Sequence, residues 1–293
     1  MKRILTLIGI VLLCSFIYSP IFAQENKTQE PSADIPDWLK RTEFSAQWET
    51  DKKPTFYLQT VQPLYQDNLK ENTIFIQPRL SLRDERLTSN LGLGYRRLTS
   101  ENLLLGANLF FDYQDLHRHA RAGFGLEALG QIFEGRFNTY FAGITPKRLV
   151  QDTGATQTYE RVVNGMDLEI GASVPYLHWL KIYGSGFWYD FKTFKDKVGW
   201  KSRAEAKLND YLSLEFYTWD DNKGDQQYGG RVRVNIAFNG LFDFRDALKP
   251  SKEPFPKKDL TESTLIPVER SYDITVEKWT KSATTTIEVY RGN

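Results

Sequence analysis

The chain has very little thiol chemistry available to it. Its 293 residues include a single cysteine, Cys14. That cysteine lies in an N-terminal segment that we predict to be removed, so the mature chain would carry no thiol. A disulfide framework, a cysteine nucleophile and a thiolate metal site are therefore excluded.

Long apolar runs and an excess of positive charge are also missing. After Ala23 there is no apolar run of the roughly 18 residues that a transmembrane helix needs. The chain has 38 Lys and Arg against 37 Asp and Glu, and without Lys2 and Arg3 the balance is 36 to 37. Nucleic-acid-binding proteins usually show a strong basic excess, so we predict no nucleic-acid partner.

Residues 1–23 have the layout of an export signal. A basic start precedes an apolar run, and the small residue Ala23 ends it. We predict a cleaved signal peptide. Lipid attachment at Cys14 is the alternative, which the large Leu13 before it disfavours. The polar residues 24–40 are expected to form an unstructured periplasmic leader.

Strict alternation of apolar and polar residues is the strongest pattern in the chain. In residues 228–238 two faces alternate, namely Val232, Val234, Ile236 and Phe238 against Arg231, Arg233 and Asn235. Successive side chains of a strand point to opposite faces. The pattern recurs in nearly every strand-like segment, and aromatic residues make up 14% of the chain. An all-β fold follows, a transmembrane antiparallel β-barrel with lipid outside and a polar lumen.

We predict about twelve strands, since single-chain bacterial barrels have an even number. They are expected at residues 42–50, 54–62, 72–83, 86–97, 102–113, 119–129, 131–142, 159–174, 179–190, 197–208, 211–220 and 227–238. Short turns alternate with connections that are mostly longer or more polar, the longest being 143–158. Short turns are typical of the periplasmic side, so both ends of the barrel domain, 41–239, are expected there.

Six motifs in order between Phe44 and Phe238 add a family resemblance. They are NLGLGYR (90–96), LGANLFFDY (105–113), RAGFGLE (121–127), NTYF (138–141), GMDLE (165–169) and VPYL (174–177). The chain resembles the inverse autotransporters, typified by the membrane domains of intimin and invasin. The resemblance implies a twelve-stranded outer-membrane barrel whose following segment threads back through the lumen to display a passenger outside.

Two sets of residues are predicted to face the lumen. The charged set comprises Arg79, Arg83, Arg96, Arg121, Glu127, Arg136, Asp167, Glu169, Arg203, Glu205 and Arg233. The glycine set comprises Gly92, Gly94, Gly106, Gly123 and Gly125. Glycine inside a strand marks either close approach by another backbone or a relief of barrel curvature, and both explanations remain open.

The composition changes after Phe238. Residues 241–248 are compatible with two short helical turns, and the proline-rich stretch 249–256 ends them. We predict a helix and linker through the pore at 240–270, because about ten extended residues at ~3.3 Å each cross a ~30 Å core. Residues 271–293 would form a short extension, which is either a frayed tail or a segment that forms a hairpin or pairs with a partner strand. An immunoglobulin-like passenger needs roughly 100 residues, so none is expected here.

Catalytic and metal-binding alternatives rest on three histidines, His117, His119 and His178. None lies in the histidine-x-serine arrangement of twelve-stranded outer-membrane phospholipases, so we predict no enzyme activity. His117 and His119 lack a clear third ligand, and the acidic loop 220–225 lacks the closing glutamate of a calcium loop. We therefore predict no metal site and no cofactor.

The sequence favours an outer-membrane translocator and display barrel of a Gram-negative bacterium, an adhesin-like anchor that exports its own C-terminal segment. A stand-alone channel or structural barrel is the alternative. Expected partners are outer-membrane lipid, a surface partner of the C-terminal tail and, by family resemblance, the barrel assembly machinery and periplasmic chaperones.

Overall fold

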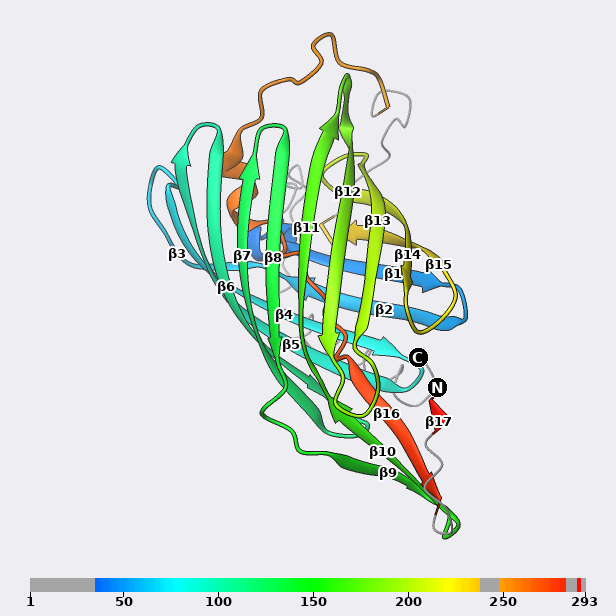
Figure 1. Cartoon of the computed structure of the whole chain (residues 1–293). Coiled ribbons are helices and arrows are strands. Elements are labelled where there is room, and N and C mark those ends of the chain that lie inside the picture. Colours follow the sequence, from blue (N-terminus) through cyan, green and yellow to red (C-terminus); the bar gives the residue numbers. More distant parts are fainter. Residues whose placement is uncertain (1–34, 238–247, 283–288, 291–293) are drawn as a thin grey trace, which may run out of the picture. The chain divides into compact units, whose positions relative to one another are not determined.

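Twelve strands form one closed antiparallel ring (Figure 1) in the computed structural model, which describes residues 35–237, 248–282 and 289–290. The ring consists of β1 (Thr42–Glu49), β2 (Lys52–Thr60), β4 (Asn72–Arg83), β5 (Arg86–Ser100), β6 (Leu103–Gln114), β7 (His119–Gly130), β8 (Phe133–Phe141), β11 (Asn164–Val174), β12 (Leu177–Asp190), β13 (Lys197–Lys207), β14 (Leu212–Asp221) and β15 (Gln227–Asn235). Neighbours along the chain pair throughout, and β1 pairs with β15 to close the ring. The predicted all-β barrel of about twelve strands is confirmed.

A thirteenth strand, β3 (Gln62–Gln66), extends β2 rather than adding to the ring. Both β2 and β3 pair with β4, β2 along its second half and β3 along its first. The interruption falls at Val61, whose side chain is buried. The sequence predicts one strand at 54–62, and the structure divides this edge into two.

The two faces of the wall have opposite polarity. Along β4 the side chains of Gln77, Arg79 and Ser81 are buried, whereas Ile74 and Leu80 are exposed. Around the ring, apolar side chains are exposed and polar ones buried, the reverse of a soluble protein. The exposed apolar residues include Leu91, Leu93, Leu109, Phe111, Leu126, Leu168, Ile170 and Phe216. Such an apolar outer surface suits lipid. Within the described residues, no helix is long and apolar enough to cross a membrane.

The ends of the ring carry different connections. We call the end with connections 50–51, 84–85, 115–118, 142–163, 191–196 and 222–226 the rim. The opposite end, with connections 67–71, 101–102, 131–132, 175–176 and 208–211, is called the turn end.

A second, four-stranded sheet is separate from the ring. It contains β9 (Arg148–Asp152), β10 (Thr156–Val162), β16 (Val276–Ser282) and β17 (Val289–Tyr290), in the order β17-β16-β10-β9. The rim connection of β8 and β11 thus folds into a hairpin, β9–β10, and the C-terminal strand β16 lies beside β10 (Figure 1).

One prediction about this region is wrong, and the structure decides between two alternatives for the C-terminal extension. A single strand at 159–174 is predicted, but the chain leaves the ring at Val163, where two consecutive residues, Val162 and Val163, are both buried and alternation fails. For residues 271–293 two alternatives were open, and the frayed tail does not describe residues 276–282, because they pair with β10 and, as a hairpin, with β17. Strand β9 was missed because its residues are mostly exposed and lack alternation.

The N-terminal leader also differs in its last residues. A short helix, α2 (Asp37–Lys40), precedes β1, and the hydroxyl of Thr42 donates to the carbonyl of Trp38 at 2.8 Å. The predicted signal peptide and the two helical turns predicted from residue 241 lie outside the described residues, apart from Leu248.

Candidate functional site

The lumenal segment, defined as residues 248–275, follows the barrel and begins at the turn end. The amide of Tyr176 donates to the carbonyl of Pro254 at 2.8 Å. The amide of Lys258 donates to the side-chain oxygen of Gln131 at 2.8 Å. Both partners belong to connections of the turn end, so the chain enters the ring there.

A short helix carries the segment past β5. Helix η1 (Leu260–Leu265) is a 3-10 helix whose N-cap, Asp259, accepts a hydrogen bond from the amide of Thr261 at 2.9 Å. At its other end the guanidinium of Arg96 donates to the carbonyls of Thr264 at 3.0 Å and Ile266 at 2.6 Å. Arg96 thereby satisfies carbonyls that the helix end leaves without intrahelical partners.

Gln77 of β4 connects the wall to the extended part of the segment. Its side-chain oxygen accepts from the amide of Val268 at 2.9 Å, and its nitrogen donates to the hydroxyl of Tyr272 at 2.7 Å. A small apolar cluster surrounds these bonds and consists of Val61, Phe75, Phe110, Val268 and Tyr272. The segment therefore has a core of its own inside the polar lumen.

Arg270 makes the most enclosed ionic contact of the segment. Its guanidinium donates to both carboxylate oxygens of Asp112, at 3.1 and 2.9 Å, and lies 4.3 Å from the ring centre of Phe110. Arg121 donates to the same carboxylate at 2.7 Å and to the carbonyl of Ser271 at 2.6 Å. Asp112 and Arg121 are fully buried, and the Arg270 side chain is 2% exposed.

The neighbouring residue, Glu269, faces the opposite wall. Its carboxylate lies 2.8 Å from Arg233 and 3.8 Å from Arg231 of β15. Those arginines also pair with Glu205 and Glu215 at 2.7 Å each. Consecutive residues of the segment thus bind opposite sides of the ring, since β6 carries Asp112 and β15 carries the arginines.

The segment leaves the ring at the rim, where Glu277 of β16 is fully buried. Its carboxylate accepts hydrogen bonds from three consecutive amides of the β12–β13 connection, those of Lys192 at 3.2 Å, Thr193 at 2.6 Å and Phe194 at 2.9 Å. Charge-assisted bonds of this kind are stronger than neutral ones. They hold the exit strand on the rim.

Every charged residue predicted to face the lumen makes a hydrogen bond or ion pair with another described residue. The buried ones are Arg79, Arg96, Arg121, Glu127, Arg136, Arg203 and Arg233. The partly exposed ones are Arg83, Asp167, Glu169 and Glu205. A cavity of about 270 Å³ remains beside the segment, and its lining includes Arg83, Asp167, Glu169 and Arg203.

The five predicted glycines are buried and closely approached. A Cβ atom at Gly92 or Gly94 would lie 2.3 Å from Phe110 or 2.1 Å from Phe75. A Cβ atom at Gly106 would lie 2.4 Å from the carboxylate of Glu127. One at Gly125 would lie 2.6 Å from the side-chain oxygens of Asn108 and Asn138. At Gly123 it would lie 2.5 Å from the guanidinium of Arg270, in the segment itself.

Several wall residues that contact the segment, or that pair with such a residue, were missed from sequence. Asp112 and Glu215 occupy polar positions of strands whose alternation was visible, so the pattern could have found them. Arg231 shares the predicted polar face of Arg233. No sequence signal shows that Glu269 and Arg270 meet opposite walls, because only the ring brings those walls around them.

A closed ring with an apolar outside and a charged inside defines the chain as an outer-membrane β-barrel. The model of the family "Inverse autotransporter, beta-domain" matches residues 18–205, and the chain belongs to this family. The sequence-based recognition is thereby confirmed.

One curated relative and one solved structure are similar to the chain. An attaching and effacing protein homolog of Escherichia coli (strain K12) is 24% identical over 177 residues, which are 59% of this chain and 57% of the relative. The chain thus matches little more than half of that protein's length. A structure from work on the in-meso crystallization of membrane proteins has a TM-score of 0.65 and 18% identity, and covers 81% of this chain and 99% of its own. It shows the fold alone.

A more distant structure is the KdgM porin, with a TM-score of 0.47 and 6% identity over 68% of this chain and 99% of the porin.

Proposed function

We propose that the chain is a translocator and display barrel of the inverse autotransporter type, which carries its own C-terminal segment through the lumen to the cell surface. The buried contacts of the lumenal segment carry this proposal. From Lys258 at the turn end to Glu277 at the rim, wall residues hydrogen-bond to the segment at successive depths. In this assignment the turn end faces the periplasm and the rim faces outward.

Buried charge supports the role of the segment. Glu269 supplies a carboxylate to the arginines of β15, and Arg270 supplies a guanidinium to Asp112 of β6. A buried charge without a partner costs several kcal/mol, so each cluster favours an occupied lumen. The strand pairing of β16 with β10 then favours retention of the segment on the outer side.

The proposal includes the steps that place the barrel in the membrane. Residues 1–23 direct export and are cleaved, and periplasmic chaperones and the barrel assembly machinery insert the chain in the outer membrane of a Gram-negative cell. Catalysis has no part in it. The imidazoles of His117 and His119 both face the carboxylate of Glu160 and not a serine hydroxyl, which is consistent with a non-catalytic anchor.

Epitope accessibility in intact cells tests the proposal. An epitope appended after Asn293 and one inserted at Gly154 in the β9–β10 hairpin are both expected to bind antibody on intact cells. The same epitope between Asn209 and Asp210, at the turn end, is expected to bind only after the envelope is opened. Labelling of the Gly154 epitope but not of the Asn293 epitope would refute export of the segment and favour a stand-alone barrel.

Ion conductance separates display from a channel role. Removal of residues 248–293 is expected to raise the conductance of the purified barrel in a planar bilayer, because the segment occupies the lumen. Equal conductance with and without these residues would show that the segment does not obstruct the pore.

A further inference from the structure

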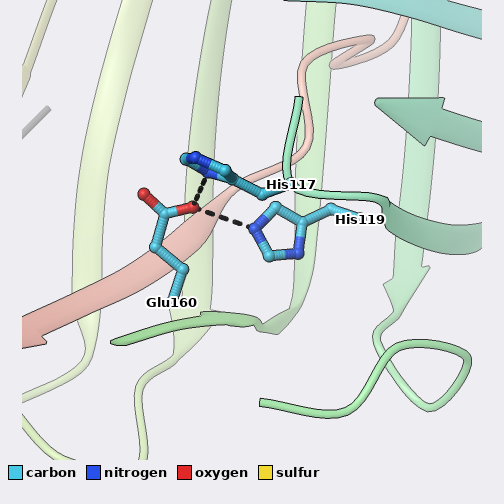
Figure 2. A group of neighbouring side chains, drawn as sticks. All are labelled: His117, His119 and Glu160. Carbon is cyan, nitrogen blue, oxygen red and sulfur yellow. Dashed lines mark hydrogen bonds and ion pairs between the residues drawn. The ribbon is translucent and has the colours of Figure 1, made fainter. Parts of the chain in front are cut away.

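Two histidines and a glutamate meet at the rim, away from the lumenal contacts. Nδ1 of His117 lies 2.7 Å, and Nε2 of His119 lies 2.9 Å, from the same oxygen of Glu160 (Figure 2). The three ligand atoms all lie within 4.8 Å of one another. His119 and Glu160 are buried, and the His117 side chain is 22% exposed.

The fold supplies the third ligand that the sequence lacks. His117 lies in the β6–β7 connection and His119 begins β7, while Glu160 comes from β10 of the hairpin. Between the histidines, Arg118 has a φ of 54°, a left-handed conformation that non-glycine residues rarely adopt. The two imidazole rings stand nearly perpendicular, with centres 5.9 Å apart, and both face the carboxylate.

Hydrogen bonding leaves this cluster incompletely satisfied. Nδ1 of His119 is buried and has no hydrogen-bond partner among the described residues. The second oxygen of Glu160 has an ion-pair contact, with Lys278 of β16 at 3.3 Å, but no hydrogen bond. A buried polar group without a hydrogen bond in a native fold calls for an explanation. An ion at the carboxylate would supply a partner for the second oxygen of Glu160, but it would not reach Nδ1 of His119, because Nε2 is the ring nitrogen that faces the carboxylate.

Glu160 lies in β10, outside the ring that crosses the membrane. Two imidazole nitrogens and one carboxylate oxygen are a common ligand set for Zn²⁺.

We propose that His117, His119 and Glu160 bind one divalent transition-metal ion, with Zn²⁺ as the best match, and that the ion fastens the β9–β10 hairpin to the β6–β7 connection. Tetrahedral Zn²⁺ with bonds of about 2.0–2.2 Å separates its ligand atoms by about 3.3–3.6 Å. The two nitrogen–oxygen contacts, now 2.7 and 2.9 Å, therefore open by about 0.4–0.9 Å on binding. The exposed edge of His117 gives the ion access, and water completes the coordination.

This site goes beyond the proposed function, because binding does not depend on export. Its role is local. The hairpin holds β16, and the ammonium of Lys278 contacts Glu160, so an ion here would bind the rim and the exit strand into one unit.

Titration of the purified barrel with Zn²⁺ tests the proposal. The chain carries no histidine tag, is held in detergent and is first stripped with a chelator. Calorimetry is expected to show one equivalent of Zn²⁺ bound and no comparable binding of Ca²⁺, which prefers oxygen ligands. His117→Ala and Glu160→Gln are each expected to weaken binding at least about tenfold.

His178→Ala is the matched control, because His178 is exposed at the turn end and should leave the affinity unchanged. Retained gel mobility of the unheated barrel shows that each variant is folded. Co²⁺ gives a second readout, since visible absorption bands of a tetrahedral site should appear in the parent chain and vanish in His117→Ala.

Zinc binding that survives both ligand substitutions would overturn the proposal. So would the absence of a single stoichiometric site in the folded parent chain, which would identify the cluster as a hydrogen-bonded clasp alone.

Discussion

The anchoring of the lumenal segment by Arg270 leads to a quantitative prediction. Arg270→Met removes a guanidinium that makes two hydrogen bonds to Asp112, at 3.1 and 2.9 Å, and that lies 4.3 Å from the ring centre of Phe110. Breaking a buried ion pair by removing one partner typically costs about 3–5 kcal/mol. Asp112 keeps two hydrogen bonds, from Arg121 at 2.7 Å and from Asn90 at 2.8 Å, so we expect the lower end of this range, about 3 kcal/mol.

The lost interaction energy should favour local detachment of the lumenal segment from the wall rather than unfolding of the whole barrel. A change of about 3 kcal/mol multiplies the open population of the segment roughly 100-fold. The amides of Val268 and Ser271, which donate to Gln77 and to Tyr140, should then exchange hydrogen roughly 100-fold faster. Exchange measured by mass spectrometry on the barrel in detergent reports these residues, and the strands of the ring serve as an internal reference.

Lys257→Met is the matched control for this experiment. It removes the same charge from the same segment, but the pair of Lys257 with Glu101 is solvent-exposed, with side chains 68% and 80% exposed. Exposed pairs contribute little to stability, so exchange should rise by less than about threefold. If Arg270→Met and Lys257→Met gave the same exchange at Val268 while the ring stayed protected, the reasoning about buried charge in the lumen would be wrong.

Three further predictions concern packing, the exit strand and the rim cluster. Gly94→Ala should destabilise the barrel by about 1–3 kcal/mol in a thermal melt, because the new Cβ would lie 2.1 Å from the Phe75 ring. A Cβ at Gly135 would have nothing within 4 Å, so Gly135→Ala should change the stability of the barrel little. Equal effects of the two would contradict this. Glu277→Gln should speed proteolysis within β16 about tenfold, because the three backbone amides then donate to a neutral side chain instead of a carboxylate. An unchanged rate of digestion would exclude the anchoring role of Glu277. Lys278→Gln should tighten Zn²⁺ binding severalfold in calorimetry, because a cation 3.3 Å from the proposed ligand is removed, and weaker binding would count against the site.

Much of the fold is encoded in local periodicity. Gln77, Arg79 and Ser81 alternate with apolar neighbours, and that period of two assigns each side chain to one face before any partner strand is known. The bounds predicted for β4 agree with the structure residue by residue. Alternation and the predicted export signal were together sufficient to predict an outer-membrane barrel of about twelve strands.

Local periodicity fails where a strand changes partners. Residues 159–174 read as one strand, but pairing with β16, which lies more than 100 residues later in the chain, draws β10 out of the ring at Val163. Residues 159–162 would be extended whether they paired in the ring or in the second sheet, so their local pattern is the same in both cases. Only the tertiary structure decides which sheet they join.

The sequence by itself determined the two faces of the wall, the order of the strands and the family. Only the tertiary structure decided which charges meet, since ring closure places Asp112 and Arg233 on opposite sides of Glu269 and Arg270. It also decided that Glu160 completes the histidine cluster, from a hairpin 41 residues beyond His119. The face to which a side chain points follows from the alternation of neighbouring residues. The partners of a buried charge depend instead on how distant strands close around it.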